Sequence, residues 1–357
     1  MTSSNDDARA ASADPPGSRG SGHAHHSAAI PGISNLPTPA RLTVGIVSAG
    51  RVGTALGEAL ERAGHVVGAV VARSPQSRRR VEQRLPESAI LDLADVVSRS
   101  ELLLISVPDA VLPSVIADIA ATGALRPRTL VAHTAGAHGV GILAPLTALG
   151  ATGLAIHPAM TFVGTADDTS RLTRACFGIT AGDEVGDAIA AALVIEMGGE
   201  PVRVAETDRT LYHAALAHGA NHLVALISDA VTALNHAIAG PAGTGQSTAT
   251  VDGNPVRLAE RILGPLVTAS LHNVLDLGAS ALTGPVARGD AAAVDAHLAA
   301  LRALPGADAA GAVTDGAVTD GAVTEDDSIA EAYRVLARRA AHQSDAPQAV
   351  FDALRPR

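Results

Sequence analysis

The sequence has no lysine, and cysteine and aromatic residues are also scarce. All 26 basic side chains among the 357 residues are therefore arginines. Schiff-base catalysis, pyridoxal phosphate attachment and the Walker phosphate loop each require a lysine, so these three chemistries are excluded. The single cysteine, Cys176, excludes an intrachain disulfide and a cysteine-rich zinc site, and it suits a reducing compartment.

Few groups in this chain could bind nucleic acid or lipid. Three phenylalanines and two tyrosines are the only aromatic residues, and 36 acidic side chains outnumber the 26 basic ones. We therefore expect no nucleic-acid partner, because little is available to stack bases or neutralise phosphates. Apolar runs such as Val66–Ala72 and Leu102–Val107 are far shorter than the roughly 18 residues of a membrane span. The sequence thus predicts a cytoplasmic protein without membrane contact.

Short β-branched runs alternate with helical stretches over residues 41–205. Near-continuous apolar strands that alternate with helices predict a Rossmann-type, doubly wound parallel sheet, so the fold class is α/β. The predicted strands are Leu42–Val47, Val66–Ala72, Leu102–Val107, Thr129–His133, Gly153–His157 and Cys176–Ala181.

Residues 206–345 change to long alanine- and leucine-rich periodic stretches, which predict an all-helical C-terminal domain. Flexible loops are expected at 240–254 and at 305–327, where Gly-Ala-Val-Thr-Asp repeats. Residues 1–40 are expected to form a disordered tail and 346–357 a second tail. The predicted helices are Thr207–Ala239, Val256–Leu277, Asp290–Ala303 and Ser328–His342.

A glycine-containing segment follows the first predicted strand and precedes a helical stretch. Residues 48–53 read Ser-Ala-Gly-Arg-Val-Gly, which is the dinucleotide-binding fingerprint with serine in place of its first glycine. Gly50 lets the backbone approach a pyrophosphate, Gly53 lets helix and strand pack closely, and the helix start supplies free N–H groups. From this segment we predict cofactor contacts at Ser48, Gly50, Arg51, Val52 and Gly53.

Arginine and serine stand at the end of the second predicted strand, where an NAD-specific site places an acidic residue. Arg73 and Ser74 suit the 2′-phosphate of NADP, so we predict NADP as the cofactor and these two residues as its contacts. Arg78 is a secondary candidate, since 78–80 equally suit a solvated helix face. The predicted cofactor site also includes Val107 and Pro108.

Six stretches of the chain carry a resemblance to a known family. They are Gly45–Gly53, Val107–Asp109, His133–Gly136, His157–Phe162, His213–Asn221 and Leu282–Asp290. These stretches resemble a family of Rossmann-like oxidoreductases whose C-terminal half is domain of unknown function 2520. The family is similar to the 6-phosphogluconate dehydrogenase, pyrroline-5-carboxylate reductase and ketopantoate reductase group, which pairs an NADP-binding domain with a helical dimerisation domain. The resemblance implies an NADP-dependent reductase of a small carbonyl or imine acid, with ketopantoate, used in pantothenate synthesis, among the candidate substrates.

Histidine or water must supply the proton, because the lysine that such enzymes place on the first long helix of their second domain is absent. Counting four residues back from Asn221, where the resemblance would put that lysine, gives Ala217. Histidine has an ordinary pKa close to working pH. We predict Asn221 as an amide donor to the substrate, and His213 and His157 as catalytic candidates. For either histidine, the alternative is a packed or surface imidazole.

Two further residues are predicted to contact the substrate. His133 lies at a strand end, and Arg288 precedes a helix, where its guanidinium suits a carboxylate; a structural salt bridge is an equal alternative for Arg288. His218 and His222 have the spacing of a zinc-protease helix but lack its glutamate. We therefore predict no metal site.

The long predicted helix suits a subunit contact. Alanines at 214, 215, 217 and 220 leave one side of it smooth, which favours close approach of a partner helix. We predict a homodimer through the helical domain, with an internal core helix as the alternative.

A second function stays open because the lysine is absent and because serine occupies the first glycine position of residues 48–53, which we call the phosphate loop. This function is that of a non-catalytic NADP(H)-binding regulatory or interaction protein.

Overall fold

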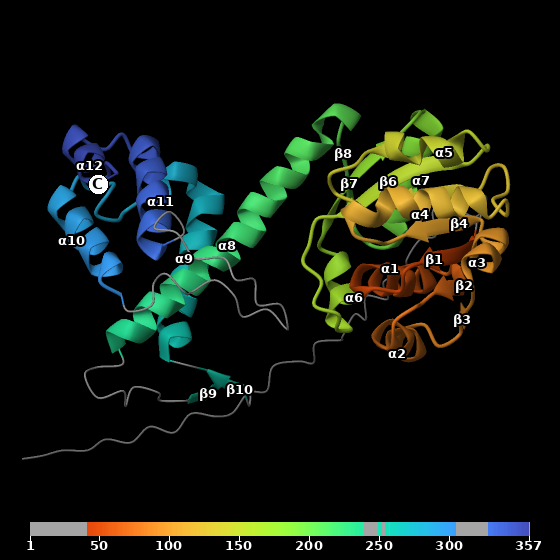
Figure 1. Cartoon of the computed structure of the whole chain (residues 1–357), viewed down its shortest axis with the longest axis horizontal. Coiled ribbons are helices and arrows are strands. Elements are labelled where there is room, and N and C mark those ends of the chain that lie inside the picture. Colours follow the sequence, from red (N-terminus) through yellow and green to blue (C-terminus); the bar gives the residue numbers. More distant parts are fainter. Residues whose placement is uncertain (1–40, 239–248, 252–253, 257, 305–327, 357) are drawn as a thin grey trace, which may run out of the picture. The chain divides into compact units, whose positions relative to one another are not determined.

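An eight-stranded sheet dominates the first part of the chain in the computed structural model, which describes residues 41–238, 249–251, 254–256, 258–304 and 328–356. The strand order is β3-β2-β1-β4-β5-β6-β7-β8 (Figure 1). The strands are β1 Thr43–Val47, β2 Val66–Val71, β3 Ala89–Ile90, β4 Leu102–Ile105, β5 Leu130–His133, β6 Thr152–Pro158, β7 Cys176–Ala181 and β8 Glu200–Arg203.

The six predicted strands are confirmed, and two points of the prediction are corrected. The short strands β3 and β8 were not predicted. The pairs from β2 to β6 are parallel, but β7 runs antiparallel to β6, with Ile156 opposite Ile179 and His157 opposite Gly178. The sheet is therefore mixed, and its carboxyl edge is formed by β1, β4, β5 and β6.

Helices cover both faces of the sheet because neighbouring strand residues point to opposite sides. Ile46 packs in one buried cluster with Leu56 of α1, whereas Val47 packs in another with Ile116 of α4. Two separate cores are typical of a doubly wound fold. The helices of this part are α1 Arg51–Arg62, α2 Pro75–Arg84, α3 Leu93–Arg99, α4 Leu112–Ala121, α5 Ala144–Thr147, α6 Asp167–Leu172 and α7 Glu184–Glu196.

Helices make up most of the remaining described chain, so the fold class is confirmed. They are α8 Arg209–Ile238, α9 Leu258–Leu277, α10 Ala291–Arg302, α11 Ile329–Gln343 and α12 Gln348–Ala353. A third buried cluster joins α10, α11 and α12 and includes Val294, Ala341 and Val350. The predicted tail 346–357 is thus wrong, because Val350, Ala353 and Leu354 are buried.

The region between α8 and α9 also departs from the prediction of a purely helical domain. A short hairpin, β9 Ala249–Val251 and β10 Asn254–Val256, begins within the predicted loop 240–254 and extends two residues beyond it, to the first residue of the predicted helix Val256–Leu277. The predicted disordered tail 1–40 and the predicted loop 305–327 lie outside the described residues. In the described chain, no helix has both the length and the apolar character that crossing a bilayer requires.

Candidate functional site

A cavity of about 610 Å³ opens at the carboxyl ends of β1, β2 and β4. Its volume lies in the range of small-molecule and cofactor sites. The turn between β1 and α1 forms one wall, and the start of α2 forms another. Seven of the nine predicted cofactor residues line it: Ser48, Gly50, Arg51, Arg73, Ser74, Val107 and Pro108.

The phosphate loop makes its tight turn at Ser48, whose φ of 77° is in the left-handed region. Glycine adopts this conformation without strain, which explains why the fingerprint ordinarily has glycine here. Gly53 supports the turn from beneath, since a Cβ on it would lie 2.5 Å from the Ser48 carbonyl oxygen and 3.1 Å from the Ser106 Cβ. Gly53 is therefore a packing residue outside the cavity lining, as is Val52.

Two arginines border the cavity beside the end of β2. Arg73 is exposed, and Arg80 is half-buried with Nη1 donating to the carbonyl oxygen of Ala49, 3.3 Å away. Ser74 caps α2, since its hydroxyl accepts a hydrogen bond from the Ser77 amide at 3.0 Å. Arg80, rather than the secondary candidate Arg78, shares the cavity with Arg73. This wall therefore offers the guanidinium groups of Arg73 and Arg80 to a phosphate.

A second group of side chains meets at the carboxyl end of β6. The Nδ1 atom of His157 lies 3.0 Å from the Tyr212 hydroxyl oxygen, and the imidazoles of His157 and His213 are 5.8 Å apart between centroids. Tyr212 and His213 are in the first turn of α8, so the structure brings together two of the three predicted catalytic residues. Gly136, in the loop after β5, packs on both imidazoles, because a Cβ there would lie 2.2 Å from His213 Nδ1.

A buried guanidinium lies beneath this cluster. Arg209 is 1% exposed and donates to the Thr180 hydroxyl and to the carbonyl oxygens of Ala155 and Gly178, at 2.8, 3.2 and 3.1 Å. Its guanidinium carbon is 5.8 Å from the ring centroid of Tyr212. These bonds pin the first turn of α8 to β6 and β7 and fix the position of Tyr212.

The electrostatics of the cluster favour a neutral imidazole at His157. Burial, followed by the nearby charges of His213 and Arg209, lowers the pKa of His157 to about 4. Burial also raises the pKa of the Tyr212 hydroxyl, against the opposing effect of Arg209. At neutral pH, His157 is therefore uncharged, and the expectation of a histidine with an ordinary pKa does not apply to it.

His133 has a different environment from the one that substrate contact requires. It is fully buried, its Nε2 donates to the Gly139 carbonyl oxygen at 2.9 Å, and its Nδ1 accepts from the Ala135 amide at 3.2 Å. Burial lowers its pKa to about 4. Both ring nitrogens are therefore occupied by backbone groups, and His133 shapes the loop that holds Gly136.

The structure does not bring Asn221 or Arg288 to this cluster. Asn221 is exposed on α8, more than two turns beyond His213. Arg288 is exposed near α10, and its guanidinium donates to the Thr283 carbonyl oxygen. His218 and His222 contact each other through Nδ1 atoms 2.7 Å apart. In the part of the chain that the structure describes, no three metal-ligating side chains gather into a group that could hold a metal ion.

Sequence reasoning missed several residues of both sites. Tyr212 and Arg209 were not predicted, although Tyr212 is one of only two tyrosines and precedes His213 directly. The scarcity of aromatic residues was the available signal for Tyr212. The cavity lining that was not predicted includes Gln76, Ser77, Arg80, Leu93, Val111, Ser114, Val115 and Asp118.

Two family models match the chain. Residues 29–158 match a Rossmann-like domain, and residues 175–340 match domain of unknown function 2520. No curated protein matches the sequence. The chain therefore consists of a Rossmann-like domain followed by domain of unknown function 2520, as the sequence motifs predicted.

Several solved structures share this fold. A protein from Bacteroides fragilis, whose name proposes an NADP oxidoreductase, is 20% identical, with 85% of this chain and 98% of that chain covered and a TM-score of 0.62. A protein from Thermotoga maritima is 18% identical, with the same coverage and a TM-score of 0.56. A reductive aminase from Aspergillus terreus, in complex with NADPH4, cyclohexanone and allyl amine, is 16% identical, with 88% and 100% covered and a TM-score of 0.53. At these sequence identities, the similarity concerns the fold alone.

Proposed function

Because the chain joins a Rossmann-like domain to domain of unknown function 2520, we propose that it is an NADPH-dependent reductase of a small carbonyl or imine acid. The observation that carries this proposal is the cavity that combines the phosphate loop with Arg73 and Arg80. Ketopantoate is one candidate acid of this class. The cavity supplies what the cofactor needs, and the His157 cluster supplies groups for the reaction.

The cavity fits the phosphates of NADP(H) in three ways. The N-terminus of α1, capped by the extended backbone of Gly50, presents free N–H groups and a positive dipole end to a pyrophosphate. Gly50 has open space where a side chain would otherwise obstruct it, since a Cβ there would meet only the Ser48 hydroxyl, 3.8 Å away. Arg73 and Arg80 suit the 2′-phosphate that distinguishes NADP from NAD.

Reduction of the substrate requires a proton donor at the carboxyl edge of the sheet, in addition to the phosphate loop that we propose to bind the cofactor. When bound, the reduced nicotinamide supplies a hydride to the substrate carbon. His157 lies at the end of β6 and His213 near the start of α8, and both imidazoles pack on Gly136 in the loop after β5. We therefore propose that these two histidines face the substrate. Asn221 stays a prediction, and Asn221→Ala belongs in the same assays.

The test is NADPH oxidation with a panel of 2-oxo acids and cyclic imino acids, measured by loss of absorbance. We expect turnover with at least one panel member, and we expect His157→Asn to lower kcat about 100-fold or more, the usual contribution of acid–base groups. NADPH binding that is tight but accompanied by no turnover on the panel would contradict the reductase. That outcome would support the alternative, a non-catalytic NADP(H)-binding protein.

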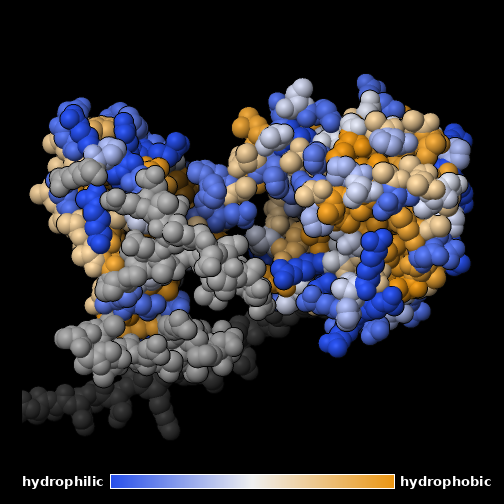
Figure 2. All heavy atoms as spheres, in the orientation of Figure 1, coloured by the Kyte–Doolittle hydropathy of each residue, from blue (hydrophilic) through white to orange (hydrophobic). Residues whose placement is uncertain are grey.

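We also propose that the chain forms a homodimer through α8 and α9. Large hydrophobic side chains on these helices are exposed, among them Leu211 at 72%, Leu266 at 62% and Leu275 at 74%. Figure 2 shows hydrophobic residues at the surface of the helical segment as well as on the sheet domain. Exposed apolar surface of this kind marks an interaction site.

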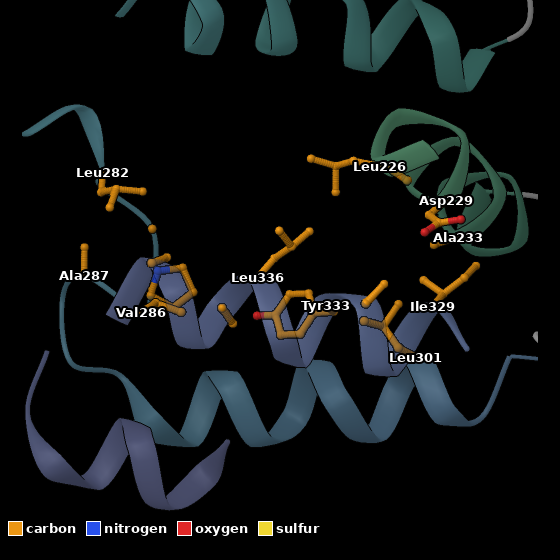
Figure 3. A pocket seen from close by; sticks show the side chains of 16 residues that line it. Leu226, Asp229, Ala233, Leu282, Val286, Ala287, Leu301, Ile329, Tyr333 and Leu336 are labelled. Carbon is orange, nitrogen blue, oxygen red and sulfur yellow. The ribbon is translucent and has the colours of Figure 1, made fainter. Parts of the chain in front are cut away.

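An apolar cavity next to α8 supports the same contact. It has a volume of about 360 Å³ and is bordered by Leu226 and Ala233 of α8, by Leu282 and by Leu336 of α11 (Figure 3). Asp229 contributes a carboxylate to its lining, and burial raises the pKa of that group. A hydrophobic segment of a second copy is the partner that we propose for this surface.

Light scattering coupled to gel filtration tests the dimer. We expect the mass of two chains for the unaltered protein and a shift to one chain for Leu266→Glu. Leu149→Glu is a matched control, since Leu149 is 46% exposed but lies outside α8 and α9. A single-chain mass at micromolar concentration would contradict the dimer.

The compartment that we propose is the cytoplasm, where the exposed, free thiol of Cys176 would stay reduced.

A further inference from the structure

We propose that His157 acts on the substrate as a neutral imidazole with its hydrogen on Nε2, and that Tyr212 is the positioning residue that keeps it in this form. The role in catalysis rests on the proposed reductase function. The state of the imidazole and its cause rest on the contacts of His157 alone, so the two parts can be tested separately.

The Tyr212 hydroxyl determines which ring nitrogen carries the hydrogen. Its oxygen lies 3.0 Å from Nδ1 of His157, with the two rings edge to face and 5.6 Å apart between centroids. The backbone of Gly178 packs against this hydroxyl, since a Cβ on Gly178 would lie 2.7 Å from its oxygen. Among the described residues, Nδ1 is the acceptor within reach of the hydroxyl hydrogen, so we assign that hydrogen to the bond with Nδ1. Since Nδ1 accepts, the imidazole hydrogen lies on Nε2.

The Nε2 side of the ring lies against the loop after β5. Gly136 in this loop permits the close approach, because a Cβ on it would lie only 3.0 Å from Nε2. His157 is half-buried, so the residue keeps some exposure to solvent. The Nε2 hydrogen is therefore presented beside the carboxyl ends of β5 and β6, where a doubly wound sheet binds its ligands.

The surrounding groups keep the ring uncharged. Burial lowers the pKa of His157, and the nearby His213, Arg209 and His133 act in the same direction, while Asp109 opposes them. Arg209 is a permanent charge, because a guanidinium is not deprotonated in proteins. A neutral imidazole that donates one hydrogen bond is thus the state in which His157 meets a substrate.

This arrangement provides a balanced proton transfer. Once the substrate carbon has gained the hydride, its oxygen or nitrogen carries the released electron pair and takes the proton from Nε2. Nδ1 then takes the hydroxyl proton of Tyr212, so His157 remains neutral with its hydrogen on the other nitrogen. Burial disfavours the tyrosinate that forms, and the positive charge of Arg209, whose guanidinium carbon lies 5.8 Å from the ring centroid, opposes this effect until solvent returns a proton.

The test is ¹⁵N NMR of the histidine rings in the full-length protein, with the His157 signals identified by their loss in His157→Gln. In the unaltered protein at pH 7, we expect a protonated Nε2 and an unprotonated Nδ1, and this neutral form should persist to about pH 5. Tyr212→Phe should give a mixture of the two tautomers. A proton on Nδ1, a charged ring at pH 7, or an unchanged tautomer in Tyr212→Phe would overturn the proposal.

The chain contains a matched control pair. The other tyrosine, Tyr333, also contacts a histidine, with its hydroxyl 2.9 Å from Nδ1 of His297 and the rings edge to face at 5.9 Å. Tyr333→Phe should therefore change the His297 signals and leave those of His157 unaltered; a change at His157 in this variant would count against a local cause.

Turnover separates the catalytic part from the structural part. With any substrate that the enzyme reduces, Tyr212→Phe should lower kcat about 10- to 100-fold, as loss of a group that orients a functional histidine does, and leave the KM for NADPH unchanged. The expected NMR result without turnover on any substrate would refute the reductase and retain the tautomer. Turnover with an unchanged kcat in Tyr212→Phe would refute the role of Tyr212.

Discussion

Alanine substitutions at Gly50 and at Gly53 should distinguish an effect on cofactor binding from an effect on stability. The added methyl group has different surroundings at the two positions. At Gly53, a Cβ would lie 2.5 Å from the Ser48 carbonyl oxygen, a backbone atom that cannot move without distorting the phosphate loop. At Gly50, it would meet only the Ser48 hydroxyl, 3.8 Å away, and it would project into the cavity.

The magnitudes follow from these distances. Overpacking a tight site costs about 1–3 kcal/mol, and a clash with backbone places Gly53→Ala toward the upper end of that range. Each kcal/mol shifts Tm by about 2–4 °C in a domain of this size, so we expect a fall of about 5–10 °C. Gly50 has an extended backbone with φ −74° and ψ −168°, which alanine adopts readily. Gly50→Ala should therefore keep its Tm within about 2 °C.

NADPH binding should be affected in the opposite order, with the larger loss of affinity in Gly50→Ala. The methyl group of Gly50→Ala holds the pyrophosphate away from the free N–H groups of α1, and loss of one charged hydrogen bond costs about 1.5–3 kcal/mol. The Kd for NADPH should rise about 10- to 150-fold. Differential scanning fluorimetry without cofactor and calorimetric titration with NADPH measure the two effects. Unaltered NADPH binding by Gly50→Ala, or equal Tm values for the two variants, would refute the reasoning.

Three other changes test neighbouring parts of the account. Arg73→Gln should raise the Kd for NADPH about tenfold and change the Kd for NADH by no more than about twofold. Arg78→Gln makes the same charge change outside the cavity and should alter neither Kd. An equal effect of Arg73→Gln on both Kd values would refute the 2′-phosphate contact. Ser48→Gly should raise stability by about 1 kcal/mol, since relief of left-handed strain outweighs the flexibility of glycine, and a lower Tm would contradict this. Unfolding free energy should fall as pH drops below about 4.5, since the pKa of Glu58 is lowered and its stabilisation is lost on protonation; Glu58→Gln should lose that part of the pH dependence in denaturant titrations.

The pH prediction depends on the environment of Glu58. Burial would raise its pKa, but hydrogen bonds from Arg84 and Thr169 and the charges of Arg84 and Arg62 outweigh burial and lower it. The Arg84 guanidinium donates to Glu58 at 3.0 Å through Nε. Because the folded-state pKa lies below the unfolded one, the carboxylate stabilises the fold above the unfolded pKa, and this contribution disappears as pH falls through the folded one.

The sheet could be predicted because its central strands are apolar on both faces, and such runs are visible in the sequence. The edge strands carry less signal: β3 has two residues, and β8 reads Glu-Pro-Val-Arg. The direction of β7 was also hidden, because an apolar run of the same composition suits either direction. Likewise, the buried helix α12 is only six residues long, too short for a periodic pattern to identify.

The proposed cofactor cavity was largely predictable because many of its residues are contiguous in the phosphate loop. The choice between Arg78 and Arg80 was not, since it depends on the rotation of α2, which the Ser74 cap determines. The His157 cluster depends on tertiary contacts: Tyr212 reaches His157 because Arg209 fixes the first turn of α8 to the sheet. No spacing in the sequence encodes a contact between residues 55 positions apart.

Calorimetric titration of the unaltered, full-length protein with NADPH and with NADH tests the central claim most directly. The cavity beside Ser48, Arg73 and Arg80 predicts one NADPH bound per chain, with a lower Kd than for NADH. Absence of measurable binding of either nucleotide would contradict the account, and a preference for NADH would contradict the role of the two arginines.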